Sequence, residues 1–150
     1  MEKFDAEKAK RVWQRVQGEA QLPKPDWEIA SLIAIKGQTA SGYARLSRYF
    51  RGQTGALMQK LYRQELEHIA TLKGLCKLHG GQPPRVSALL PAKVPAEILL
   101  RQCYGQKQQL LAAYDKYKAD PQHGGVFQML IAQEQSQCRI LLQLLGKLAK

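Results

Sequence analysis

The sequence predicts an all-α protein, an antiparallel four-helix bundle with one long crossover. Three observations indicate this class. Four long segments place apolar residues three and four positions apart, as in half-buried helices. Short breakers separate the first segment from the second and the third from the fourth. Between the two pairs lies one irregular, proline-rich stretch, residues 81–94, which is long enough to run the length of a bundle.

A chain of 150 residues is long enough to bury a sizeable core, and we expect one domain covering residues 1–150. Residues 1–22 are interpreted as a short amphipathic helix with its linker, because Phe4, Val12 and Trp13 fall on one side of it. We expect this helix to lie across the bundle rather than within it.

The bundle helices are expected at residues 26–50, 54–79, 95–119 and 123–148. Asp26 is a suitable N-cap for the first helix. Gly52 and Thr54 are expected to end that helix and to cap the second, and Gly80 to end the second. Because the first connection is so short, the two helices that it joins must be antiparallel neighbours.

The second helix contains a Glu-x-x-His pair, Glu65 and His68. Residues three apart share one face of a helix, and this pair falls on the same stripe as Met58, Leu61 and Leu72. We therefore expect a carboxylate and an imidazole to point into the bundle.

The last helix repeats the pattern as Glu134 and Gln137, with glutamine where a second histidine would stand. In the first and third helices, Lys36 and Lys107 fall on the inward stripe, each seven residues before a tyrosine. Lys36 lies 29 residues before Glu65, and Lys107 lies 27 residues before Glu134. The chain is therefore interpreted as two helical hairpins that repeat the same pattern of residues.

The predicted inward polar set is Lys36, Glu65, His68, Lys107, Glu134 and Gln137. Over roughly residues 26 to 148, this pattern resembles the ferritin-like superfamily and its rubrerythrin-related four-helix bundles. Such bundles hold two metal ions with two Glu-x-x-His helices and one Glu on each of the other two. The resemblance implies iron or manganese chemistry on peroxide, oxygen or stored iron. Three of the six residues match that ligand set, and the two lysines and the glutamine depart from it.

The charges of the two lysines and two glutamates decide between a metal-free cluster and a metal-binding site. A buried lysine or glutamate is costly unless it is paired, and two of each on facing helices make a neutral group without metal. Two divalent ions need about four carboxylates, so the sequence predicts a degenerate site with no metal and no cofactor. The alternative is a single iron or manganese ion at Glu65, His68 and Glu134, which requires both lysines to turn away or to lose their protons.

Two other interpretations concern the lysines alone. Their ammonium groups would reach solvent if the helical stripes were shifted by one position. A lysine with a lowered pKa would serve as a base or form a Schiff base, but the adjacent glutamates oppose that lowering. We therefore assign no catalytic residue and expect a non-catalytic structural or interaction protein. The alternative is a rubrerythrin-like metal-binding oxidoreductase or peroxidase with a reduced site.

The three cysteines, Cys76, Cys103 and Cys138, form no Cys-x-x-Cys pair, which excludes a local rubredoxin-like or zinc site. We interpret them as buried thiols of a reducing cytosol. His79 and His123, each followed by two glycines, are interpreted as turn residues.

The net charge of +11 is dispersed along the chain. No basic arm or aromatic stacking set accompanies it, so we expect no specific nucleic-acid partner. No run approaches the roughly 20 apolar residues that span a membrane, and the charged N-terminus lacks the apolar core of a signal peptide. We expect a cytoplasmic protein without membrane association. The sequence leaves a homodimer open and identifies no protein partner.

Overall fold

The computed structural model describes residues 29–86 and 93–148, which contain four helices. These are α3 (Ile29–Tyr49), α4 (Gly52–Leu78), α5 (Ala96–Asp115) and α6 (Gly124–Leu148). The helices pack against one another and the described residues contain no strand, which confirms the predicted all-α four-helix bundle. The helix expected in residues 1–22 and the cap expected at Asp26 lie outside the described residues.

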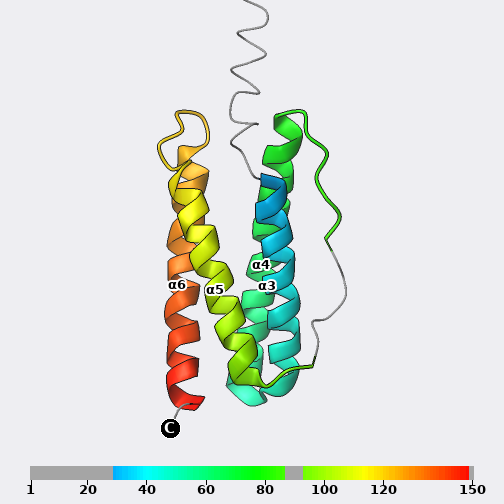
Figure 1. Cartoon of the computed structure of the whole chain (residues 1–150), viewed down its shortest axis with the longest axis vertical. Helices are drawn as coiled ribbons and strands as arrows, with labels where there is room; N and C mark the ends of the chain where they lie inside the picture. The colour runs from blue at the N-terminus through cyan, green and yellow to red at the C-terminus, as the bar shows by residue number, and fades with distance from the viewer. Residues whose placement is uncertain (1–28, 87–92, 149–150) are drawn as a thin grey trace, which may run out of the picture.

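Helices α3 and α4 form one hairpin and α5 and α6 form a second, with α3 packed against α5 (Figure 1). In Figure 1, α3 and α6 run downward, whereas α4 and α5 run upward. Two successive parallel helices need a connection that returns along the bundle. The chain between Leu78 and Ala96 makes it, and its first described residues descend beside α3, where Val86 approaches Gly37.

Two predicted helix boundaries are wrong by a few residues. Helix α4 begins at Gly52, and Thr54 lies inside it rather than capping it. Gly52 has a φ of +66°, so the chain turns at the residue that adopts this angle most easily. Helix α5 ends at Asp115, four residues before the predicted end. The amides of Lys116 and Tyr117 bond to carbonyls three residues back, which tightens the chain out of the α-helix.

The predicted end of α4 at Gly80 is correct, and its geometry explains it. Gly80 has a φ of +76°, and its amide donates to the carbonyl of Lys77 over 3.0 Å. The amide of Gly81 donates to the carbonyl of Cys76 over 2.9 Å. Together the two bonds form a Schellman motif, which supplies hydrogen-bond donors to carbonyls at the end of the helix that would otherwise have none.

The rings of His79 and His123 meet near the same end of the bundle, where α4 ends and α6 begins. Their centroids lie 5.1 Å apart and their planes cross at 85°, an edge-to-face contact. The carboxylate of Asp120 accepts a hydrogen bond of 3.3 Å from the backbone amide of His123, just before α6 starts. Both histidines therefore belong to the turns, as interpreted from the sequence, and also join the two hairpins.

The apolar core has two parts, one toward each end of the bundle. One part includes Ile33, Leu72 and Phe127, and the other includes Leu61 and Leu141. Lys36, three residues after Ile33 on α3, lies in neither part, so polar side chains interrupt the core near its middle. In the described residues, no helix is long and apolar enough to cross a membrane.

Candidate functional site

Six polar side chains, drawn from all four helices, are buried between the two parts of the core. This central polar cluster consists of Lys36, Glu65, His68, Lys107, Glu134 and Gln137. His68 is the most exposed of the six, at 3%. Each helix contributes through the inward stripe that its apolar residues define, because one face of an α-helix repeats every three or four residues. The structure therefore brings together all six residues that the sequence predicts to point inward.

The Nζ of Lys36 has three hydrogen-bond partners. It donates to Glu65 Oε1 over 3.0 Å and to Glu134 Oε2 over 2.6 Å. It also forms a hydrogen bond of 2.7 Å with His68 Nδ1. Three partners match the three N–H bonds of an ammonium group.

Lys107, on the other hairpin from Lys36, also bonds to the carboxylates of Glu65 and Glu134. Its Nζ donates to Glu65 Oε1 through a short bond and to Glu134 Oε1 over 3.1 Å. The same atom lies 5.4 Å from the ring centroid of Tyr43, within the range of a cation–π contact. Each lysine therefore bridges both glutamates, and the two positive and two negative charges sum to zero.

The pairing changes the pKa of Glu134. Burial alone would raise the pKa of this carboxyl, because it penalises the charged form. His68 and the ammonium groups of Lys107 and Lys36 outweigh burial and hold the pKa at about 2. The carboxylate therefore remains ionised at every pH at which the protein is expected to work.

The two lysines differ in pKa. Burial, the largest effect, lowers the pKa of Lys36, and the nearby charge of Lys107 adds to this against the attraction of Glu65. Burial also acts to lower the pKa of Lys107, but attraction by Glu65 and Glu134 outweighs it and raises the pKa. On alkalinisation, Lys36 is therefore the first of the two to lose its proton.

Two glutamines that the predicted set omits complete the hydrogen bonding. Gln133 Oε1 accepts a short bond from His68 Nε2, and Gln64 Oε1 accepts the amide of Gln137 over 3.0 Å. Each of these glutamines directly precedes a cluster glutamate, so the two pairs are equivalent under the repeat that relates the hairpins. That shared Gln-Glu dipeptide is the sequence signal that could have found them.

The repeat is broken at the two tyrosines. The hydroxyl of Tyr43 donates to Gln137 Oε1 over 2.8 Å. The equivalent hydroxyl of Tyr114 is buried and has no hydrogen-bond partner among the described residues. Burial raises the pKa of both phenols, and the carboxylates add to the effect, so neither ionises near neutral pH.

Glu65, His68 and Glu134 are the group in the described residues that could hold one metal ion. Each offers a ligand atom, and these atoms lie within 4.8 Å of one another. Glu65 Oε2 has no hydrogen-bond partner among the described residues. The lysines, however, already form hydrogen bonds with both carboxylates. With a second ion, two metal ions and two ammonium groups would be neutralised by only two carboxylates. The residues therefore do not fit a two-metal site.

Comparison of the chain with descriptions of protein families, with curated proteins and with solved structures finds no match.

Proposed function

We propose that this chain is a ferritin-like, rubrerythrin-related bundle in which a lysine–glutamate cluster has replaced the two metal ions. In this proposal it works without metal or cofactor as a structural or interaction protein. The observation that supports it is the double bridging, in which Lys36 and Lys107 each contact both Glu65 and Glu134. The order of helix directions, with a long return between α4 and α5, agrees with a ferritin-like topology (Figure 1).

A cation at each metal position supplies the charge that converging carboxylates require. In a two-metal bundle the ions neutralise the carboxylates, and here the two ammonium groups do so. A neutral cluster between two apolar regions can hold the helices in one arrangement without a bound ion. We also propose that the protein works in a reducing compartment such as the cytosol, since Cys76, Cys103 and Cys138 are all free thiols.

The test is elemental analysis of protein purified from medium supplemented with iron and manganese. We expect far less than one ion per chain, both for the wild type and for a Glu65→Gln variant that weakens any ligand set. Near-stoichiometric iron or manganese in the wild type, lost in the variant, would overturn the proposal.

A second candidate is a metal-binding oxidoreductase that uses one iron or manganese ion. The convergence of Glu65, His68 and Glu134 within 4.8 Å favours it. For this function, removing a competing cation should strengthen binding, so Lys36→Met should bind Mn²⁺ more tightly than the wild type. Titration calorimetry that detects no binding to either protein would exclude it.

A further inference from the structure

Outside the central polar cluster, the two hairpins differ in charge. Residues 29–86, the α3–α4 hairpin and the start of the connection after it, carry eight Lys and Arg residues and one acidic residue, a net charge of +7. Residues 93–148 carry six Lys and Arg residues and three acidic residues, a net charge of +3. Most of the net charge of +11 therefore lies on the first hairpin.

The basic residues of the two hairpins also differ in their pairing. On the second hairpin, Arg101 is paired with Glu97 and Lys118 with Asp115. On the first, seven basic residues form no ion pair within the described part of the chain: Arg48, Arg51, Lys60, Arg63, Lys73, Lys77 and Arg85. Their charge is therefore available to a partner.

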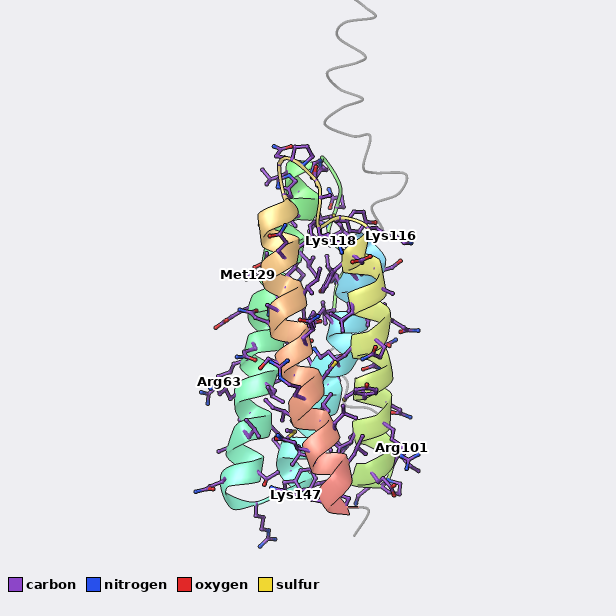
Figure 2. The ribbon with its side chains drawn as sticks, turned by 90° about the vertical axis from the view of Figure 1, so that its left-hand side faces the viewer. Arg63, Arg101, Lys116, Lys118, Met129 and Lys147 are labelled. Atoms are coloured by element: carbon purple, nitrogen blue, oxygen red, sulfur yellow. The ribbon has the colours of Figure 1, made fainter. Side chains whose placement is uncertain are left out.

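Four of these seven residues lie on one side of α4 and define what we call the α4 basic face: Lys60, Arg63, Lys73 and Lys77. Successive residues of an α-helix are turned by about 100°, so the four fall within roughly 140° of arc, opposite the buried Glu65 and Leu72. From Lys60 to Lys77 the helix extends about 26 Å. In Figure 2, Arg63 points outward from α4, away from the rest of the bundle.

The other side chains on this side of α4 limit what the face can bind. Glu67, between Arg63 and Lys73, is the one exposed acidic residue of α4. Leu66, 44% exposed, is the one large apolar side chain exposed between Lys60 and Lys77. Protein interfaces depend on clustered aromatic anchors, and membrane-surface helices depend on a row of inserted apolar residues. The α4 basic face has neither, so separated positive charges are its means of binding.

We propose that the α4 basic face binds the phosphate backbone of a nucleic-acid duplex, irrespective of base sequence. A duplex carries one negative charge per roughly 1.7 Å of its axis, so 26 Å of helix faces about 15 phosphates. Cations at any spacing along α4 then find a phosphate nearby, whereas an acidic protein must place each carboxylate separately. This surface is separate from the central polar cluster, so the inference goes beyond the proposed function.

The number of cations sets the expected dependence on salt. The logarithm of the binding constant falls with the logarithm of the salt concentration, with a slope of about −0.9 for each phosphate neutralised. Four contacts give a slope of about −3.6, so the affinity should fall about 150-fold between 50 and 200 mM salt. Binding that is independent of base sequence usually has a Kd of about 1 to 100 μM at physiological salt, and we expect a value in that range.

The test is fluorescence anisotropy of the full chain with two labelled 20-base-pair DNA duplexes of unrelated sequence, at several salt concentrations from 50 to 200 mM. We expect equal Kd values for the two duplexes and a slope between −3 and −4. A Kd above 100 μM at 150 mM salt, or a strong preference for one duplex, would overturn the proposal. So would displacement of the duplex by polyglutamate or by phosphatidylserine vesicles at equal concentration of charge, which would assign the face to an acidic protein or to a membrane.

Matched variants locate the contact. Lys60→Gln combined with Arg63→Gln should reduce the steepness of the slope by about 2, because two phosphate contacts are lost. Lys116→Gln combined with Lys147→Gln is the control, since both lysines are exposed on the second hairpin and the net charge changes equally.

A variant of opposite sign is Glu67→Gln, which should tighten binding because it removes the anion from the face. Far-UV circular dichroism checks that every variant folds, and the central polar cluster is intact in all of them. Equal effects of the two double variants would show that only the total charge matters, and would overturn the assignment to α4.

Discussion

Replacing Glu65 with alanine should destabilise the fold far more than an ordinary substitution. Oε1 of this residue accepts hydrogen bonds from both buried ammonium groups. Without it, Lys36 and Lys107 share the single carboxylate of Glu134, and the cluster carries an uncompensated positive charge with no access to water. Breaking a buried ion pair on one side costs about 3 to 5 kcal/mol. For a chain of this length, that lowers Tm by roughly 6 to 20 °C.

The assay is urea unfolding followed by circular dichroism, with thermal melts in parallel. Glu67→Ala is the matched control, because Glu67 is an exposed glutamate on the same helix and the net charge changes equally. A double variant, Glu65→Ala with Lys107→Met, should recover much of the loss, since it removes both members of a buried pair. If Glu65→Ala and Glu67→Ala cost the same small amount, or the double variant is no better than the single, the reasoning from charge is refuted.

Acidification should weaken the fold through Glu134, whose stabilising charge is fully present above the ordinary pKa of 4.5 and is lost as the pH falls toward about 2. Urea midpoints at pH 5, 4 and 3 should fall steeply in the wild type and less steeply in Glu134→Gln, and parallel curves would contradict this. Tyr43→Phe should cost about 1 kcal/mol, because Gln137 loses its hydrogen-bond donor. Tyr114→Phe should cost almost nothing, since that hydroxyl has no partner among the described residues. A larger loss for Tyr114→Phe than for Tyr43→Phe would contradict the assigned contacts.

The inward direction of the polar residues could be predicted because helical periodicity is a property of the sequence itself. Glu65 falls on the stripe of Met58, Leu61 and Leu72, and all four are buried. The repeat of spacings between the two hairpins then located Lys36 and Lys107. The fold class followed from the same periodicity together with the lengths of the connections.

Contacts across the cluster could not be predicted, because they depend on how far each helix is rotated about its axis. Gln64 and Gln133 lie at the edges of their stripes, and only the packing of α4 near α6 makes them partners of Gln137 and His68. The different pKa directions of the two lysines likewise depend on distances between atoms. Helix ends were missed where local geometry, such as the positive φ of Gly52, decides between neighbouring residues.

The central claim is that two lysines perform the electrostatic role of two metal ions. Lys36→Glu, Lys107→Glu and Gln137→His, combined in one variant, would give four helices with two lone glutamates and two Glu-x-x-His pairs. This is the ligand set of the two-metal bundle. In chelator, this triple variant should be less stable than the wild type, because four carboxylates converge without a counter-charge.

The measurement is the Tm of wild type and triple variant, each in chelator and in excess Mn²⁺. The wild type should melt at the same temperature in both conditions, whereas Mn²⁺ should raise the Tm of the variant, since the ions bind only the folded state. A variant as stable as the wild type in chelator, or one whose Tm does not respond to Mn²⁺, would contradict the claim that the lysines stand where metal ions would bind.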